Sequence, residues 1–400
     1  MISTSPNFKV ALFLGRHETA ASGLWVYGRA LLEALRDQVV RERRASSDTE
    51  GSRARIALTC FFGGGEQLQK ELREIKERDR ELEVYRLPSF GVGRRMSFLT
   101  DLLSLSREMD LVHGTANVVP LFGKGKKVLT LHDLLQAYPT EQAGGVYNML
   151  KTGWYRLQIW ALVRSVDLIV TDLEKTRDEI VRRYRPSVPV AVVYPGLEKC
   201  YQQGRSGGDT KAQRQQGHFL CFASRDQRKN VDRLLEAFAQ VYKTNAALRL
   251  TVLASSKAVA KKIESKLAPL ALEEVVAVKS GIAPERMPAF YASFQALLFP
   301  SLAEGFGYPI YEALSQGTPV LCNGDNLVKD LDAEARKGIV SCDPLEVAAL
   351  CEGINQIAAL ELSSEERDRM ANCVKEQFDF TRSATKLLEL YREVLQGTML

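Results

Sequence analysis

The stretch FPSLAEGFGYPIYEALSQGTPV, residues 299–320, decides the fold of this chain. Its apolar start predicts a buried strand, and a loop with two glycines follows that strand. Pro309 at the first helical position and Gly317 just past the last one predict a helix over residues 309–316. A strand, a loop and a helix in this order are typical of a parallel sheet that binds a ligand at its strand ends.

The loop and the first turn of this helix predict an anion site. Backbone N–H groups at a helix N-terminus lack partners within the helix and lie at the positive end of its dipole. The residues that would present them are Gly305, Phe306, Gly307 and Tyr308. Glu304 suits sugar hydroxyls, and Glu312 could accept hydrogen bonds from both hydroxyls of a ribose. Together these residues indicate a nucleotide sugar, whereas a lone Gly-x-Gly would more simply permit tight packing.

The whole segment resembles the signature of the retaining glycosyltransferases of the GT-B fold, the family called family 4 or group 1. The family motif P-S-x-x-E-G-F-G-x-P-x-x-E-A-x-x-x-G-x-P-V is matched at Pro300, Ser301, Glu304, Gly305, Phe306, Gly307, Pro309, Glu312, Ala313, Gly317, Pro319 and Val320. The resemblance implies an α/β protein with two doubly wound Rossmann-like domains that face a deep cleft. It further implies an acceptor-binding domain in residues 1–195, a nucleotide-sugar-binding domain in residues 196–380, and a last helix in residues 381–400 that returns to the N-terminal domain.

The order of apolar runs and helical patterns agrees with this architecture. Strands and helices alternate, which predicts parallel sheets covered on both faces. Strands are expected at residues 9–14, 55–62, 111–113, 128–132, 167–171 and 190–193, and again at 218–223, 249–253, 275–278, 296–299 and 319–322. Helices are expected at residues 23–39, 66–81 and 383–395. The arginine-rich residues 41–55 and the polar residues 202–216 are expected to be loops.

Length and composition exclude several classes of protein. A chain of 400 residues exceeds what one hydrophobic core normally serves, which predicts two domains. No apolar run is long enough to span a bilayer, and the N-terminus MISTSPNFKV lacks a basic segment followed by an apolar one, so a cytoplasmic protein is expected. The seven cysteines show no C-x-x-C spacing and no pairing with histidine, which indicates reduced core residues rather than a zinc site.

The net charge of +5 is concentrated in the first half of the chain. Residues 1–200 contain 30 Lys and Arg against 24 Asp and Glu, whereas residues 201–400 contain 24 against 25. No dense basic stripe with interleaved aromatic residues occurs, which argues against nucleic acid as a partner. Attraction to an anionic membrane surface or to a phosphorylated acceptor would fit the excess, and an ordinary solvated surface is the alternative.

A second group of candidate residues lies in FASRDQRKN, residues 222–230. Arg228 and Lys229 would bring two positive charges to the carboxyl edge of a parallel sheet and could stabilise a diphosphate leaving group. A solvent-facing basic turn is the alternative. The resemblance implies that Lys229 binds the diphosphate. Ala223 and Ser224 stand where the family has Gly-Arg, so Ser224 is a donor-binding candidate and the role of the arginine would fall to Arg228 or Arg225.

A third group follows the expected strand at residues 128–132, in VLTLHDL. His132 at a strand end could face a cleft, with Asp133 fixing its tautomer or contacting an acceptor hydroxyl, whereas most such histidines are structural. The resemblance implies that His132 contacts the donor sugar, and it makes His113, in DLVH, a candidate for lining the cleft and contacting the acceptor. It also makes Gly23 and Ile282 donor-binding candidates, and Arg16 and His17 candidates for acceptor contact.

The resemblance implies transfer with retention of configuration and without a metal or cofactor. Arg228, Lys229 and the helix N-terminus would offset the phosphate charge. In the family Glu304 holds donor hydroxyls, although a retaining enzyme could in principle use a carboxylate nucleophile. Together with His132, these residues are the catalytic candidates.

The function expected from the resemblance is transfer of a hexose to a growing bacterial surface polysaccharide or glycolipid, as in bacterial mannosyltransferases. GDP-mannose is the favoured donor, and UDP- and dTDP-sugars are alternatives. A nucleotide-sugar synthase or epimerase on the same fold, and a non-catalytic nucleotide-sugar-binding subunit, are the other readings.

Two segments combine basic residues with an apolar helical face. Residues 91–105, GVGRRMSFLTDLLSL, are the favoured candidate for weak peripheral contact with the inner face of the cell membrane. In Val146–Val163, with Trp154, Tyr155 and Trp160, the same pattern is interpreted as a stripe that faces the core.

Overall fold

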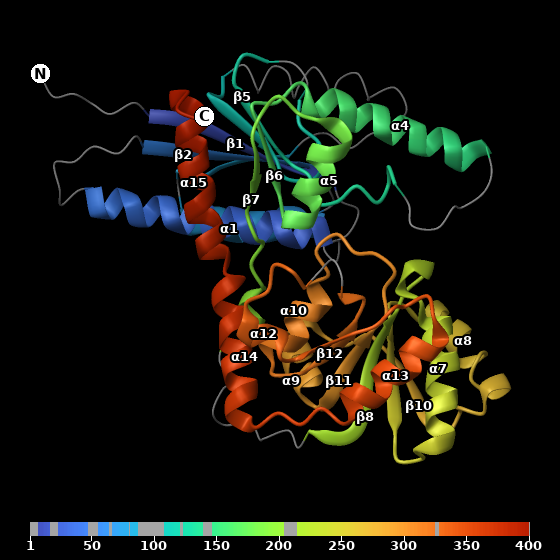
Figure 1. The fold of residues 1–400 in the computed structure, drawn as a ribbon. Coiled ribbons are helices and arrows are strands. Elements are labelled where there is room, and N and C mark those ends of the chain that lie inside the picture. Colours follow the sequence, from blue (N-terminus) through green and yellow to red (C-terminus); the bar gives the residue numbers. More distant parts are fainter. Residues whose placement is uncertain are drawn as a thin grey trace, which may run out of the picture. The chain divides into compact units, whose positions relative to one another are not determined.

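The computed structural model describes residues 7–16, 23–46, 55–63, 66–79, 81–86, 108–120, 123–138, 146–203, 214–324 and 328–399. These residues form two compact units (Figure 1). The first unit contains the described residues up to 138, residues 146–196 and residues 378–399, and the second contains residues 197–377. The chain therefore crosses into the second unit after Gly196 and returns to the first unit at Phe378.

The first unit is built on a seven-stranded parallel sheet in the order β3-β2-β1-β4-β5-β6-β7. Because the order runs outward in both directions from β1, the neighbouring strands β1 and β4 form a topological switch point. The strands are β1 (Asn7–Arg16), β2 (Arg55–Gly63), β3 (Glu83–Arg86), β4 (Leu111–Gly114), β5 (Lys126–Thr130), β6 (Leu168–Thr171) and β7 (Val190–Val192).

Alternating side chains of this sheet enter two separate apolar cores. Val10, Leu12 and Leu14 of β1 pack on one face, and Ala11 and Phe13 pack on the other. The first face is covered by α1 (Gly23–Ser46), α2 (Glu66–Glu77) and α15 (Phe380–Gln396). The second face is covered by α5 (Glu174–Tyr184) and by the C-terminal end of α4 (Val146–Val163).

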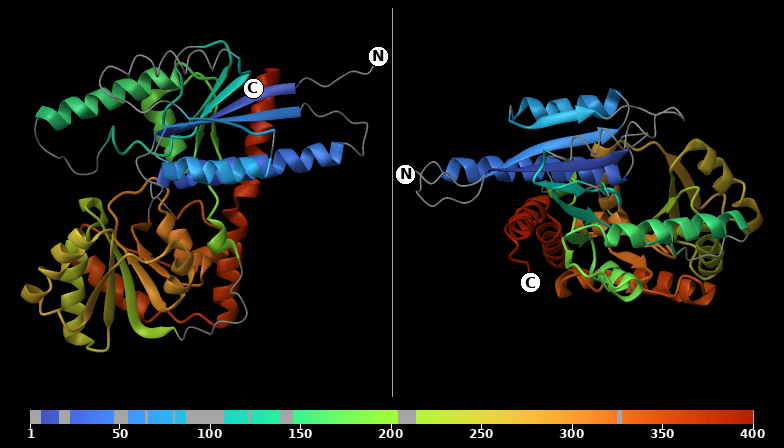
Figure 2. Two further views of the ribbon diagram at one scale, coloured as in Figure 1. Left: turned by 180° about the vertical axis from the view of Figure 1, so that it is seen from behind. Right: turned by 90° about the horizontal axis from the view of Figure 1, so that it is seen from above.

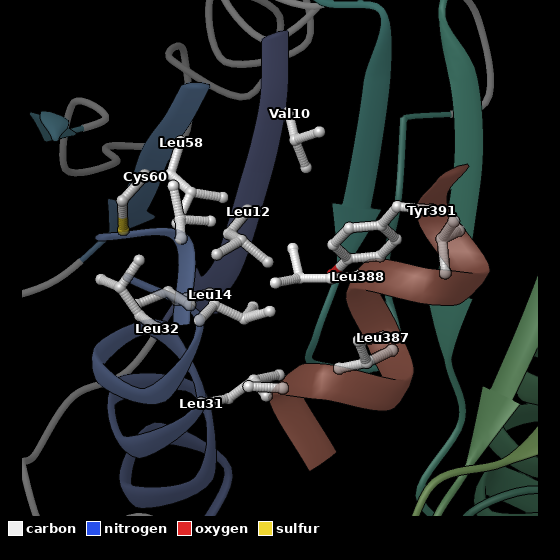
Figure 3. Close-up of a cluster of buried hydrophobic side chains, with 14 of the residues drawn as sticks. Val10, Leu12, Leu14, Leu31, Leu32, Leu58, Cys60, Leu387, Leu388 and Tyr391 are labelled. Carbon is white, nitrogen blue, oxygen red and sulfur yellow. The ribbon is translucent and has the colours of Figure 1, made fainter. Parts of the chain in front are cut away.

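The last helix of the chain, α15, completes the first core. Leu387, Leu388 and Tyr391 lie among the β1 and α1 side chains (Figure 3), and Leu388 is fully buried. Figures 1 and 2 show α15 crossing α1 at a steep angle, and an ion pair between Arg392 and Glu42 links the two helices. The core of the first unit therefore includes a segment that residues 197–377 separate from the rest of the unit in the sequence.

The second unit contains a six-stranded parallel sheet in the order β10-β9-β8-β11-β12-β13, with its switch point between β8 and β11. The strands are β8 (Gln215–Ala223), β9 (Arg249–Ala254), β10 (Val276–Ser280), β11 (Phe294–Phe299), β12 (Val320–Cys322) and β13 (Ile339–Ser341). One face packs on α7 (Val231–Thr244), α8 (Lys257–Glu264) and α13 (Val347–Ala358). The remaining helices include α6 (Lys199–Gln202), α9 (Met287–Ala292), α10 (Tyr308–Ser315), α12 (Ala333–Arg336) and α14 (Ser364–Gln377).

These two sheets confirm the expected α/β class with two doubly wound Rossmann-like domains. The expected loop at residues 41–55 was wrong in its first part, because α1 continues to Ser46. There Arg43 donates to the Ile56 carbonyl at 3.1 Å, so this basic end of the helix is held against β2. The sequence analysis did not predict the short edge strands β3 and β13. The candidate membrane-contact segment, residues 91–105, lies outside the described residues. Among the described helices, none is long and apolar enough to cross a membrane.

Candidate functional site

The switch point of the second unit brings two sequence-predicted loops together. β8 and β11 are adjacent and parallel, so their carboxyl ends lie at the same edge of the sheet. The loop after β8 contains Arg228 and Lys229, and the loop after β11 contains Glu304 and the two glycines. Ligands of doubly wound folds bind at this place because the neighbouring loops diverge to opposite faces and leave a crevice.

The loop after β8 is held in one conformation by its own polar groups. It contains the short 3-10 helix η2 (Gln227–Lys229), whose Arg228 N–H donates to Asp226 Oδ1 at 3.0 Å. Asn230 follows in the left-handed region at φ 55°, which asparagine tolerates better than most residues. Its side-chain amide is buried and donates to the Pro344 carbonyl at 2.6 Å. Lys229 is therefore part of a turn whose conformation these hydrogen bonds hold.

Lys229 and Glu304 contact each other across the two loops. Lys229 Nζ donates to Glu304 Oε1 at 2.6 Å, and the hydroxyl of Ser301 donates to the same oxygen at 2.5 Å. Lys229 Nζ also lies 4.6 Å from the ring centroid of Phe299. The side chains of Lys229 and Glu304 are 21% and 14% exposed, so both can still be reached by a ligand. An ammonium group carries three N–H donors, so this contact leaves donors for a phosphate.

Arg228 has a different partner from the one that the sequence predicts. Its Nε donates to Asp226 Oδ2 at 2.9 Å, and Nη2 donates to the same oxygen at 2.5 Å. These hydrogen bonds lower the pKa of the Asp226 carboxyl. In this structure Arg228 thus closes its own turn, and its contact with a diphosphate stays a prediction.

The helix after β11 begins one residue earlier than expected. α10 starts at Tyr308 and ends at Ser315, and Gly307 precedes it with a φ of 82°. A side chain at position 307 would be strained in this left-handed conformation, which accounts for the second glycine of the motif. The ring of the buried Phe306 stacks on Tyr311 with centroids 4.4 Å apart, so Phe306 anchors the loop from inside.

Glu312 lies on α10 and is held by two tyrosines that the sequence analysis did not identify. The hydroxyl of Tyr291, on α9, donates to Glu312 Oε2 at 2.6 Å, and Tyr201, on α6, also hydrogen-bonds to Glu312. Burial raises the pKa of Glu312 to about 7, the tyrosine hydroxyls oppose this rise, and the nearby Glu198 adds to it. Glu312 therefore changes its charge close to neutral pH.

The remaining donor-binding candidates of this unit are spread along the same edge. Ser224 follows β8 directly, and its hydroxyl accepts from the Asp226 N–H at 3.1 Å. Gly305 is half-buried in the loop after β11. Ile282 follows the edge strand β10, which β9 separates from β8. Ile282 is thus two strands away from the switch point, about 10 Å across the sheet.

An Asp-x-Asp triplet, Asp330-Leu331-Asp332, lies just before α12. The carboxylate of Asp332 has a structural role there, since its Oδ1 accepts from the Glu334 N–H at 2.9 Å. This hydrogen bond caps the short helix α12.

In the first unit, His132 is enclosed by two acceptors. Its Nδ1 lies 2.6 Å from Asp172 Oδ2, and its Nε2 lies 2.8 Å from the Thr115 carbonyl oxygen. A carbonyl oxygen and an ionised carboxylate can only accept, so with Asp172 ionised this arrangement favours the imidazolium form, in which both ring nitrogens carry a hydrogen. Burial alone would lower the pKa of His132, but the Asp172 carboxylate outweighs it and the pKa is raised.

The partner of His132 corrects the expectation for Asp133. Asp133 Oδ1 accepts from the Leu135 N–H at 2.9 Å, whereas Asp172 fixes the imidazole ring. Asp172 follows β6, the strand next to β5. The contact could have been predicted from the sequence, because His132 and Asp172 are polar residues that follow two neighbouring parallel strands. The contact of Nε2 with the Thr115 carbonyl leaves neither ring nitrogen of His132 for a sugar hydroxyl in this conformation.

His113 is a buried structural residue, which contradicts the idea that it contacts an acceptor. It has no exposed surface; Nδ1 lies 2.5 Å from the Tyr391 hydroxyl, and Nε2 lies 2.7 Å from Thr130 Oγ1. Burial lowers the pKa of His113 to about 3, so the ring is neutral. The histidine thereby ties β4 to α15.

The other candidates of the first unit lie near the switch point between β1 and β4. Gly23 begins α1, and a Cβ there would meet no atom within 4 Å, so the position has open space. The backbone of Arg16 ends β1. The side chain of Arg16 and all of His17 lie outside the described part of the chain.

Comparison with known proteins gives the class of the second unit. Residues 209–377 match the family model Glycosyl transferases group 1. O-antigen chain mannosyltransferase B from Escherichia coli is 27% identical over 179 residues, which cover 44% of this chain and 46% of that protein. The chain thus spans about half the length of this curated relative.

Solved structures resemble almost the whole chain in fold. Sucrose-phosphate synthase from Thermosynechococcus elongatus has a TM-score of 0.70 at 17% identity and covers 98% of this chain and 100% of its own. HepE from Anabaena, in complex with UDP-glucose, has a TM-score of 0.65 at 15% identity and covers 96% and 100%. With the two sheets and the matched motif, these likenesses define a protein of the GT-B fold. Its second unit is a group 1 glycosyltransferase domain, which confirms the resemblance found in the sequence.

Replacing Asp172 by Asn should destabilise the first unit by about 3 kcal/mol, because it leaves a buried imidazolium without its carboxylate. The pKa of His132 is raised in the folded state, so the pair contributes fully below about pH 6.5 and loses its contribution as pH rises through the folded pKa. Urea unfolding at pH 6 and pH 8.5 should show a larger loss at pH 6. The exposed Asp178→Asn is the control, and equal losses in both variants would contradict the imidazolium.

Proposed function

We propose that this protein is a retaining glycosyltransferase that moves a hexose from a nucleoside-diphosphate sugar to a hydroxyl of a bacterial surface polysaccharide or glycolipid. The observation that carries the proposal is the contact between Lys229 and Glu304, 2.6 Å apart at the switch point of a group 1 glycosyltransferase domain. The mannosyltransferase name of the Escherichia coli relative supports mannose as the transferred sugar, and GDP-mannose is the donor that we favour. UDP- and dTDP-sugars are the alternatives.

The contact of Lys229 with Glu304 positions opposite charges for the two ends of such a donor. Lys229 would bind the diphosphate with its remaining N–H groups and stabilise the charge that develops as the diphosphate leaves. Glu304, held by Ser301, would accept hydrogen bonds from the sugar hydroxyls. Arg228, from the same turn as Lys229, would add positive potential next to the phosphates.

Retention of configuration is compatible with attack on the face from which the diphosphate departs. The bond between the anomeric carbon and the diphosphate oxygen breaks, the acceptor oxygen bonds to that carbon, and the departing phosphate takes the hydroxyl proton. This step depends on positioning more than on a strong base. In the proposal, Lys229, Arg228 and the N-terminus of α10 supply the positive potential, so no metal is required.

The general test is incubation with GDP-mannose, UDP-glucose and other nucleotide sugars, with and without a glycan acceptor. We expect release of nucleoside diphosphate that increases with acceptor, and turnover in EDTA within about a factor of two of the control. Loss of turnover in EDTA that Mg²⁺ or Mn²⁺ restores would contradict the charge assignment. An altered nucleotide sugar without transfer would indicate a synthase or epimerase, and binding without turnover would indicate a non-catalytic subunit.

Replacing Lys229 by Ala should lower kcat at least as strongly as it raises KM, by about 100-fold or more in kcat/KM, because the charge on the leaving group grows in the transition state. Steady-state kinetics with the preferred donor measure this. Lys243→Ala, an exposed lysine on α7, is the matched control. If Lys229→Ala changes only the melting temperature, Lys229 is a structural residue.

Replacing Tyr291 by Phe should make nucleotide binding more sensitive to pH. The hydroxyl of Tyr291 favours the ionised form of Glu312, so its removal should raise the pKa of Glu312 further above 7. If the ionised carboxylate binds the ribose, affinity for the free nucleoside diphosphate should fall several-fold at pH 7 and recover near pH 9. Calorimetric titration across this range tests it, with Tyr242→Phe as control. A loss that is independent of pH would remove Glu312 from the ribose role.

A further inference from the structure

The exposed apolar side chains of the described residues are concentrated on one helix. Eight large hydrophobic residues are exposed, and five of them lie on α4: Met149, Leu150, Trp154, Leu157 and Trp160, with exposed fractions from 48% to 67%. The other three lie singly elsewhere: Tyr85 on β3, Val181 on α5 and Leu345 in the turn before α13. Single exposed apolar residues are normal, whereas a cluster marks an interaction surface.

The five side chains form a single face, named the α4 face from here on. At 100° per residue they fall within an arc of about 140° around the helix axis. The described side chains of α4 become buried only at its C-terminal end, at Leu162 and Val163. Figures 1 and 2 show the rest of α4 extending beyond the sheet of the first unit. The pattern interpreted from the sequence as a core-facing stripe thus faces outward along most of the helix.

The α4 face is bordered by positive charge. No Asp or Glu occurs between Val146 and Val166, whereas Lys151, Arg156 and Arg164 are exposed there. Arg164 lies over the ring of Trp160, 4.3 Å from its centroid. Arg156 and Arg183, from α4 and α5, lie over the ring of Tyr138 at 4.6 and 3.8 Å, so the C-terminal turn of α5 adds basic residues nearby.

We propose that the α4 face docks on the surface of an anionic lipid bilayer, with the helix lying in the plane of the interface. Tryptophans beside basic residues and an apolar face suit the boundary between acyl chains and anionic headgroups. Charge complementarity distinguishes this occupant from a second copy of the chain, because a two-fold pairing of the same face would bring the same basic residues together. The surface lies on α4, whereas the sequence favoured residues 91–105. The proposal does not depend on the donor or on turnover.

The chain contains its own spectroscopic reporter for this contact. Of its three tryptophans, Trp25 is fully buried, while Trp154 and Trp160 lie on the α4 face. Adding vesicles of phosphatidylglycerol and phosphatidylcholine should shift the tryptophan emission to shorter wavelength, and acyl-chain bromine should quench it. Pure phosphatidylcholine vesicles should produce neither effect at the same lipid concentration. The variant Trp154→Phe/Trp160→Phe keeps an apolar face but should abolish the shift, because only Trp25 remains.

Vesicle sedimentation gives the binding measurement. Trp154→Ser/Trp160→Ser and Lys151→Glu/Arg164→Glu should each weaken binding to anionic vesicles at least tenfold without changing the melting temperature, since all four side chains are exposed. Tyr85→Ser and Lys243→Glu are the matched controls on other elements and should bind like the wild type. High salt should release the wild-type protein.

Three results would overturn the proposal. The first is wild-type protein that stays in the supernatant with anionic vesicles at low salt, and the second is undiminished binding of the Trp154→Ser/Trp160→Ser variant. The third is a concentration-dependent dimer in light scattering that this variant loses, which would assign the α4 face to a second copy. A protein without glycosyltransferase activity that still binds vesicles through α4 would leave the docking surface intact.

Discussion

The reversal of strand order between β8 and β11 is the constraint on which the candidate site depends. It places the ends of two adjacent parallel strands side by side while their helices leave toward opposite faces. Lys229 and Glu304, which are 75 residues apart in the sequence, meet at 2.6 Å because of this geometry alone. The hydrogen bond from Asn230 to Pro344 and the left-handed Gly307 then hold the two loops in place. The fold thereby assembles a charged site without a long flexible segment.

The first unit uses a similar device for a different purpose. His132 and Asp172 also stand at the ends of adjacent parallel strands, β5 and β6, and form an ion pair. Their side chains are only 8% and 3% exposed, against 21% and 14% for Lys229 and Glu304. Both ring nitrogens of His132 are engaged, whereas an ammonium retains donors. In this conformation, exposure and remaining hydrogen-bonding capacity therefore distinguish the two pairs, and only Lys229 retains donors for a ligand.

The sequence predicted the fold and the residues of the loop after β11 because both depend on local patterns. Pro309, Gly307 and Gly317 act within a few residues of their own positions, and the alternation of strands and helices follows from periodicity. The partners that tune the site could not be predicted in this way. Asp172 lies 40 residues from His132, and Tyr391 lies 278 residues from His113, so only the completed sheets bring them together. The strands β3 and β13 were missed because they are only four and three residues long and none of their side chains is fully buried, so they show no clear apolar pattern.

The orientation of the α4 face could not be predicted from the sequence either. A helical stripe of apolar residues has the same sequence signature whether it faces a core or the solvent, and periodicity alone cannot distinguish the two. What decides is where the helix meets the sheet, and the described part of α4 packs against this core through Ile159, Leu162 and Val163, near its C-terminal end. The five exposed side chains of the α4 face do not belong to this core. Their free energy of burial is available to a partner, and the basic residues around them select one with negative charge.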